Sequence, residues 1–258
     1  MAIRLDLNEL FHSTSPLDYN SPYAVSFWFR LHSLATGGDQ TLFELFLDNS
    51  NFDRISLQDS NNRFVVTAMS GGASTTGQYT TALVVNVWYH VLMGRSSTTS
   101  LSGFIFGNGG TGAPSSSQSV AGRAAASGMS CGATWRDPEI TFPADVSICA
   151  MKLLTGSANV ALARVESFER QHAIPRWWEF VQGWWPFVRG FTQFTDLSGK
   201  GRTWTQVGTI GETDNPPIGW EPTYSTALAT TADAVAVPEP GFLADSVRRQ
   251  SRRRLVRM

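Results

Sequence analysis

The chain of 258 residues has very little lysine, only two cysteines and no long apolar run. Because a membrane-spanning helix needs about 20 apolar residues in succession, the longest apolar runs are too short to predict a transmembrane segment. The start, MAIRLDLNELF, alternates apolar and polar residues and lacks the apolar stretch of a signal peptide. We therefore expect no signal peptide, no transmembrane segment and no membrane partner.

The few cysteines and histidines show no spacing typical of a zinc site. Cys131 lies in a stretch rich in glycine and serine, and Cys149 lies in an expected strand. A disulfide between them stays open, although two free thiols is the interpretation we prefer.

Short apolar segments separated by turn signals dominate what the sequence does contain. The chain is 42% hydrophobic and 16% charged, which is enough apolar material for one large core. Gly37-Gly38-Asp39, Asp48-Asn49-Ser50-Asn51 and Gly71-Gly72 punctuate the first hundred residues at regular intervals. This spacing is typical of an all-β sandwich.

The stretch Ala82–Phe106 is the most informative and predicts two strands joined by a polar turn. Its first strand is apolar on both faces, so we expect it inside the sandwich and not at an edge. Val85, Val87, Tyr89, Val91 and Met93 would share one face, and Val84, Trp88, His90 and Leu92 the other. On such a strand His90 is expected to be a buried, hydrogen-bonded core residue and not a ligand.

Several motifs, in order, are similar to the laminin-G-like, or concanavalin-A-like, lectin superfamily. Trp88-Tyr89-His90-Val91 with Gly94-Arg95 resembles its central hairpin, and five further stretches resemble its other strands: Ala24–Leu31, Thr41–Leu45, Arg54–Leu57, Arg63–Thr67 and Asp145–Cys149. The resemblance covers roughly residues 1–220. It implies a concanavalin-A-like jelly-roll β-sandwich of two antiparallel sheets, whose function depends on sites carried by the fold.

Elements outside these motifs complete the expected domain. Residues 107–132 are rich in glycine and serine and predict a long surface loop, with at most a short strand near Gln118. Residues 157–170 predict one short helix, and residues 182–187 and 203–207 predict late strands. The late segments DLSGKG, VGT and DNPPI resemble versions of the family found in tailed-phage structural proteins.

A change of composition after Trp220 predicts two parts: the sandwich at 1–220 and an extended Ala/Thr/Pro arm at 221–258. The arm ends in six arginines without any acid, which leaves a formal net charge of −7 on the rest, since the whole chain carries −1. The arginines are either a solvated end or an anchor that binds acidic protein surfaces or nucleic acid. They are Arg248, Arg249, Arg252, Arg253, Arg254 and Arg257.

The lectin superfamily includes glycosidases, which place two carboxylates on either side of the sugar. No expected strand here offers such a pair: Glu44 and Asp48 are separated by a strand end, and Asp137 and Glu139 flank a proline in a loop. We therefore expect no enzymatic activity, no catalytic residue and no cofactor.

Two groups of residues are candidate binding sites, and each also has a purely structural interpretation. Asp48, Asn49, Asn51 and Asp53 could hold calcium at a loop rim, but we prefer the interpretation that these Asp and Asn residues are turn formers and expect no metal site. Trp177, Trp178, Trp184 and Trp185 could stack on a glycan, but we prefer the interpretation that they seal the helix against the sandwich or contact a neighbouring subunit.

The resemblance and the basic tail together favour a non-enzymatic virion protein of a tailed phage, as a capsid decoration or a fibre or spike subunit. Its expected partners are other virion proteins such as the major capsid protein, further copies in a closed oligomer such as a trimer, and a host-surface glycan. The alternative is a glycan-binding adhesin or lectin, and a glycosidase ranks below both.

Overall fold

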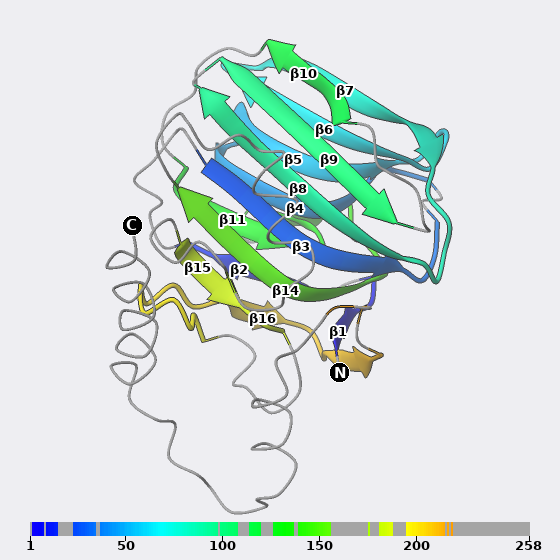
Figure 1. Cartoon of the computed structure of the whole chain (residues 1–258), viewed down its shortest axis with the longest axis vertical. Coiled ribbons are helices and arrows are strands. Elements are labelled where there is room, and N and C mark those ends of the chain that lie inside the picture. The colour runs from blue at the N-terminus through cyan, green and yellow to red at the C-terminus, as the bar shows by residue number, and fades with distance from the viewer. Residues whose placement is uncertain are drawn as a thin grey trace, which may run out of the picture. The chain divides into compact units, whose positions relative to one another are not determined.

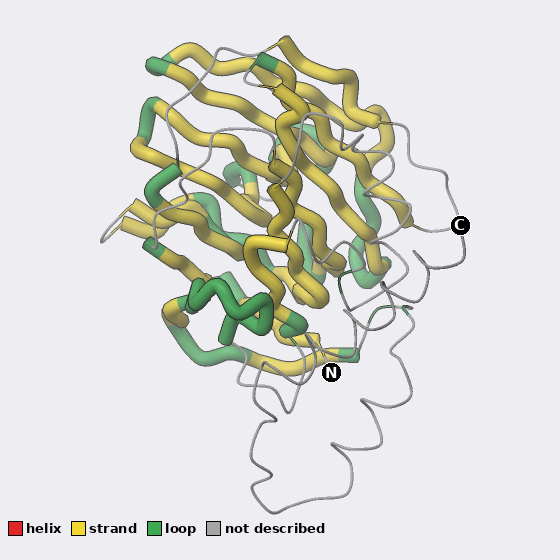
Figure 2. The backbone as a smooth tube through the Cα atoms, turned by 60° about the vertical axis from the view of Figure 1, so that its left-hand side comes forward, coloured by secondary structure: helices red, strands yellow, loops and turns green. Residues whose placement is uncertain are grey.

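Two antiparallel β-sheets face each other as a sandwich in the computed structural model of the chain (Figure 1). The structure describes residues 2–7, 9–14, 23–34, 37–97, 99–107, 114–119, 126–136, 139–155, 175, 181–187, 195–214, 216 and 218. The described residues form strands joined by turns and loops, and no helix occurs among them, as Figure 2 shows. The predicted all-β jelly-roll sandwich is therefore confirmed.

The first sheet, called sheet A, has eight strands. Its order is β10-β9-β8-β3-β14-β1-β17, and β15 pairs with the second half of β14, beside β1. The strands are β1 Ala2–Leu5, β3 Tyr23–Leu31, β8 Trp88–Ser97, β9 Ser100–Gly107, β10 Pro114–Ser119, β14 Val146–Thr155, β15 Val181–Trp185 and β17 Gly211–Thr213.

The second sheet, called sheet B, has seven strands in the order β16-β2-β11-β4-β5-β6-β7. They are β2 Leu10–Ser13, β4 Gln40–Asp48, β5 Asn51–Gln58, β6 Arg63–Ser70, β7 Ala73–Ala82, β11 Gly128–Cys131 and β16 Thr205–Val207. A small hairpin of β12 Thr134–Arg136 and β13 Glu139–Thr141 follows β11. It contacts β4 and β11 of sheet B.

The core lies between the sheets because each central strand alternates inward apolar residues with outward ones. Phe27 and Phe29 of β3 and Val91 and Met93 of β8 point into it and are fully buried. Sheet A also buries part of its outer face, where Leu92 and Trp184 belong to a second apolar cluster. The prediction that β8 lies inside the sandwich is confirmed, since it pairs with β3 on one side and β9 on the other.

Three sequence-based boundaries need correction. The strand expected from Val84 begins only at Trp88, because Asn86 takes a positive φ of 61° in a turn and leaves Val84 50% exposed. The expected loop at 107–132 contains β10 and β11, so Cys131 lies in a buried strand. Leu7, which continues the alternation of Ile3 and Leu5 in the sequence, is 49% exposed because β1 ends at Leu5.

Later elements agree with the sequence where the structure describes them. The strand expected at 182–187 is β15, and the strand expected at 203–207 is β16. All the described residues belong to one compact unit, Met1–Gly219. The expected helix at 157–170 and the arm at 221–258 lie outside the described residues. A search of the described part finds no membrane-spanning helix.

Candidate functional site

A row of polar side chains crosses the outward face of sheet B from one edge to the other. Strand register sets the row, because directly paired residues on neighbouring strands point to the same face. Each member is the Cα partner of the next: Thr76, Thr67, Arg54, Glu44, Ser130, His12 and Thr205. We call these seven residues the polar row.

The middle of the polar row is an ion pair enclosed by aromatic rings. Arg54 Nη2 lies 3.1 Å from Glu44 Oε1, with side-chain exposures of 15% and 0%. The Arg54 guanidinium carbon also lies 4.4 Å from the ring centre of Phe52 and 5.2 Å from that of Phe142. Glu44 and the two rings therefore fix the direction in which the remaining Arg54 donors point.

Phe142 is unusual in two ways. Its φ is +54°, a conformation that bulky residues rarely adopt, and its side chain is 41% exposed. A backbone hydrogen bond of 2.8 Å from Thr41 N to Phe142 O helps to hold it there. The strained backbone thus presents an aromatic ring to solvent beside Arg54, and backbone strain of this kind is concentrated at functional sites.

The β12–β13 hairpin brings a second aromatic ring to the other half of the polar row. Trp135 stacks on His12 with ring centres 4.3 Å apart and an interplanar angle of 17°. A hydrogen bond of 3.0 Å between the hydroxyls of Thr41 and Thr134 ties the hairpin to β4. Ser130, between His12 and Glu44 in the row, is fully buried, and its hydroxyl has no hydrogen-bond partner within the described part.

Chemically, the polar row offers a flat aromatic ring beside fixed hydrogen-bonding groups. An aromatic face binds the apolar face of a ring-shaped ligand, while guanidinium and hydroxyl groups bind hydroxyl groups at its edge. Glu44 is the one carboxylate in the row, and Arg54 already binds it. Acid–base catalysis on a glycosidic bond uses two carboxylates about 5–10 Å apart, and the polar row itself contributes one.

The four candidate calcium-binding residues do not point toward one another in the structure. Asp48 accepts hydrogen bonds from Ser50 N at 2.7 Å and Asn51 Nδ2 at 3.0 Å, which is the turn-forming role weighed against calcium. Asn49 lies in the same turn. Asp53 points the other way, into the sandwich, where it is fully buried. The four residues therefore do not converge, and no cluster of three or more metal-binding side chains occurs among the described residues.

Asp53 instead joins the two sheets. Its carboxylate accepts hydrogen bonds from Arg95 Nε at 2.8 Å, from Arg95 Nη2 at 2.7 Å and from Tyr23 Oη at 2.6 Å. Burial alone would lower the pKa of Arg95, but the hydrogen bonds and charge of Asp53 outweigh burial and raise it. Asp53 therefore has a structural role: it connects the two sheets.

The structure describes two of the four tryptophans that were candidates for a glycan or subunit contact. Trp184 and Trp185 are only 3% and 1% exposed, and Trp185 donates a hydrogen bond of 3.0 Å from Nε1 to Arg202 O. Burial of both rings corrects the suggestion that they contact a glycan. Trp177, Trp178 and the arginines Arg248, Arg249, Arg252, Arg253, Arg254 and Arg257 lie outside the described residues.

His90 and the two cysteines have the structural roles expected from the sequence: a buried histidine and two free thiols. His90 is 1% exposed, and its Nε2 lies 2.9 Å from Ser26 Oγ, so the prediction of a buried, hydrogen-bonded residue is confirmed. Both cysteines are free thiols. Burial raises the pKa of both, to about 12 for Cys149, so neither is a reactive nucleophile near neutral pH.

The sequence did not single out most of the polar row. In the sequence Glu44 stands out only through its spacing from Asp48, and no local pattern marks Phe142 or Trp135 as functional. Alternation marks Glu44 and Arg54 as outward-facing, but nothing local predicts that four separate segments align in one row.

Comparison with known proteins supports the fold. A scan against protein-family models finds no match, and a search of curated proteins finds none either. A native heptameric SAP-like pentraxin from Limulus polyphemus is 9% identical, with 81% of this chain and 93% of that chain covered and a TM-score of 0.53. A protein from Bacteroides ovatus, provisionally described as carbohydrate-binding, is 15% identical, with 85% and 62% covered and a TM-score of 0.60. At these identities the similarity establishes the lectin-like sandwich fold alone.

Proposed function

We propose that this chain is a non-catalytic carbohydrate-binding module and that the exposed half of the polar row is its saccharide surface. The observation that carries the proposal is Phe142, an exposed ring held at a strained backbone position beside Arg54. Thr67 and Thr76 extend the surface with hydroxyl groups, since they follow Arg54 in the same row. In this arrangement a sugar ring stacks on Phe142, and its hydroxyls bind Arg54 and the threonines.

The Bacteroides ovatus protein supports this proposal by its fold and its provisional description. Support for binding over catalysis comes from the polar row itself, whose single carboxylate is bound to Arg54. Carbohydrate-binding sites need no activated group, and here Arg54 is preorganised by Glu44 and two aromatic rings, which reduces the entropy lost on binding.

The test is a glycan array of neutral oligosaccharides probed with the full chain, followed by calorimetry on the best ligand. Phe142→Ala should weaken binding about fivefold, if ring stacking contributes about 1 kcal/mol. Val84→Ala is the matched control, because Val84 is 50% exposed and lies in the turn before β8, outside the polar row. Val84→Ala should bind the glycan as tightly as the unaltered chain. The proposal is wrong if no neutral glycan binds, or if Phe142→Ala binds the glycan as tightly as Val84→Ala does.

A second candidate role is that of a tailed-phage virion protein, as a capsid decoration or a fibre or spike subunit. The observation in its favour is the charge distribution, with six arginines in residues 248–257 against a formal net charge of −7 elsewhere. In this role the arm binds other virion proteins such as the major capsid protein, copies form a closed oligomer such as a trimer, and the sandwich binds a host-surface glycan.

Light scattering of the full chain and of a chain ending at Trp220 tests this role, at moderate and at high salt. The virion role expects the full chain alone to assemble or to bind purified capsid shells, and high salt to weaken this binding. Two identical monomers that do not respond to salt would exclude the arm as an anchor, and would leave a carbohydrate-binding module without that role.

A further inference from the structure

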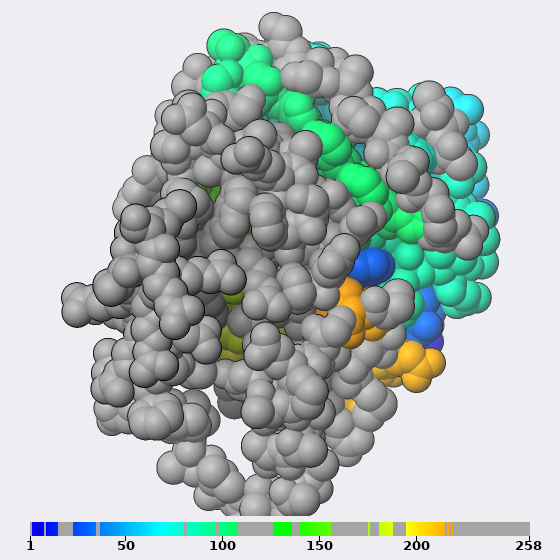
Figure 3. All heavy atoms as spheres, viewed as in Figure 1, coloured from blue at the N-terminus to red at the C-terminus, as the bar shows by residue number. Residues whose placement is uncertain are grey.

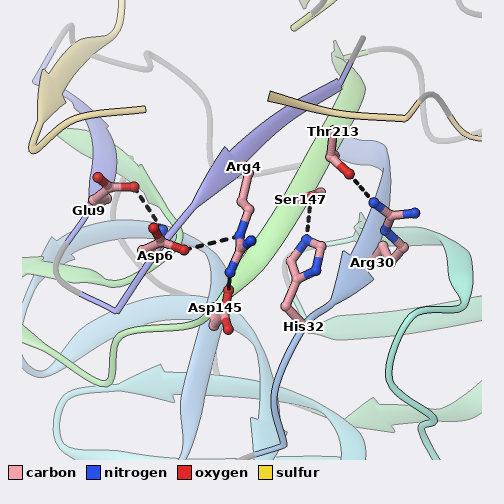
Figure 4. A network of polar contacts seen from close by, with 8 residues as sticks. All are labelled: Arg4, Asp6, Glu9, Arg30, His32, Asp145, Ser147 and Thr213. Carbon is pink, nitrogen blue, oxygen red and sulfur yellow. Dashed lines mark hydrogen bonds and ion pairs between the residues drawn. The ribbon is translucent and has the colours of Figure 1, made fainter. Parts of the chain in front are cut away.

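A second cross-strand row lies on the outward face of sheet A, on the side of the sandwich away from the polar row. Trp88, Arg30, Ser147 and Arg4 are successive Cα partners across β8, β3, β14 and β1. Figure 4 shows this region, with His32 and Ser147 between Arg30 and Arg4. Atoms in the blue of β3 reach the surface between the green ridge of β9 and orange atoms of the β16–β17 region (Figure 3).

The two arginines of this second row differ in their partners. Arg4 lies between two acids, with Nε 3.0 Å from Asp6 Oδ1 and Nη2 3.3 Å from Asp145 Oδ1. Arg30 makes no ion pair within the described part: its Nη2 donates to the hydroxyl of Thr213, and its Nε is buried without an acceptor. Among the described residues, the charge of Arg4 is thus offset by nearby acids, while that of Arg30 is not.

Arg30 is nevertheless held in a fixed orientation. Its guanidinium carbon lies 5.1 Å from the ring centre of Trp88, and the hydroxyl of Thr213 binds it from β17. Glu212, the acid next to Thr213, pairs with the core-facing Ile3 and so projects from the opposite face of β17. A planar cation with several unused N–H donors, fixed on an aromatic ring, is the arrangement that binds a carboxylate through two parallel hydrogen bonds.

His32 keeps this site free of a second charge. Burial first, and then the positive charges of Arg4 and Arg30, lower the pKa of His32 against the opposing effect of Asp145 and Asp6. Its Nε2 lies 2.5 Å from Ser147 Oγ, so the uncharged ring is already hydrogen-bonded at neutral pH. The charge available to a ligand here is therefore that of Arg30.

We infer that Arg30 and Trp88 form a binding site for a carboxylate-bearing sugar, such as a uronic acid or a sialic acid. The carboxylate binds the Arg30 guanidinium, and the partly exposed Trp88 supplies apolar contact and an indole N–H donor at its edge. This site is independent of the neutral-sugar surface proposed on sheet B, because it lies on the other sheet and uses none of the same residues.

The experiment is calorimetry of the full chain with three acidic oligosaccharides and their carboxyl-reduced counterparts. The probes are oligogalacturonate, a glucuronate-containing hyaluronan fragment and sialyllactose. We expect at least one acid to bind about 10- to 100-fold more tightly than its reduced form, as charge-assisted hydrogen bonds predict. If no acid in the set binds more tightly than its reduced form, the inference is wrong.

Variants assign the preference to Arg30. Arg30→Gln should abolish the acid preference, and Arg30→Lys should restore only part of it, because lysine keeps the charge but loses the planar fork. Arg63→Gln is the matched control, since Arg63 lies on β6 of sheet B and also makes no ion pair within the described part. An acid preference that survives Arg30→Gln, in a variant whose thermal unfolding is unchanged, overturns the site.

The outcomes separate this site from the proposed function. If neutral glycans bind through Phe142 but acidic oligosaccharides bind no more tightly than their reduced forms, only the Arg30 site is wrong. If acids bind through Arg30 but no neutral glycan binds, the polar row fails and the Arg30 site stands.

Discussion

Arg95 of β8 and Asp53 of β5 form a buried ion pair between the two sheets, with donor–acceptor distances of 2.8 and 2.7 Å and both side chains fully buried. Tyr23 Oη adds a third hydrogen bond to the same carboxylate, at 2.6 Å. The pair lies among apolar core residues, so its geometry must be good enough to offset the cost of removing two charges from water. It therefore fixes how the sheets meet more than it adds to stability.

Removing one partner of this pair should be far more harmful than removing both. Asp53→Asn or Arg95→Met alone should lower the free energy of unfolding by about 3–5 kcal/mol, because one buried charge is left without its counterion. The double variant Asp53→Leu/Arg95→Met should recover most of the loss. Urea unfolding measures all three.

The surface pair Arg4–Asp6 is the control, with side-chain exposures of 40% and 63%. Asp6→Asn, which leaves the pair of Arg4 with Asp145 in place, should cost less than about 1 kcal/mol, as loss of an exposed ion pair does. A loss in the double variant equal to the sum of the two single losses would show that Asp53 and Arg95 act independently.

Replacing Phe142 by glycine should separate stability from binding. Glycine adopts a φ of +54° without strain, so the variant should unfold at about the same urea concentration as the original chain despite the loss of a large side chain. Saccharide binding at the polar row should weaken about fivefold, as in Phe142→Ala, because the same ring is removed. A clear loss of stability would mean that the Phe142 ring supports the fold instead of serving a ligand.

The two buried cysteines should resist alkylation in the folded protein. Burial raises the pKa of Cys149 to about 12, and raises that of Cys131 as well, so iodoacetamide should modify neither thiol at pH 8 until urea unfolds the chain. Mass spectrometry of the alkylated protein checks this. Rapid labelling without denaturant would contradict the burial of both thiols.

The same thiols should also make stability fall in alkaline solution. In the unfolded chain they ionise near pH 9, while in the folded chain they stay protonated to a higher pH, about 12 for Cys149. The unfolded state therefore binds fewer protons above pH 9, and the stability from the protonated thiols is lost as pH rises from about 9 to about 12. Cys131→Ala and Cys149→Ala should flatten this decline in urea midpoints.

Gly183 should tolerate no side chain. A Cβ at this position in β15 would clash with the indole ring of Trp185, which is itself packed in the core. Gly183→Ala should lower stability by about 1–3 kcal/mol, the usual cost of overpacking a core. Gly38→Ala is the control, since nothing lies within 4 Å of its Cβ position, and it should leave the urea midpoint unchanged.

The sequence by itself determined the class of fold. Alternation in the stretch that became β8 predicted a central strand, since Trp88 to Met93 place apolar residues on both of its faces. The stretch that became β3 was predicted as a strand by its resemblance to the lectin superfamily. These signals are local, because the side-chain period of a strand depends only on neighbouring residues. The same local logic identified His90 as a buried residue and Asp48 as a turn former.

Only the tertiary structure decided where the functional groups meet. Asp53 is five residues from Asp48 in sequence, yet it points into the core toward Arg95, because strand register and not sequence distance assigns a side chain to a face. Arg54 and Phe142 are brought together by the hairpin that returns over sheet B, and Arg30 and Trp88 by the pairing of β3 with β8. Long-range pairing of this kind leaves no mark in either segment alone, so the surface sites could be found only in the folded molecule.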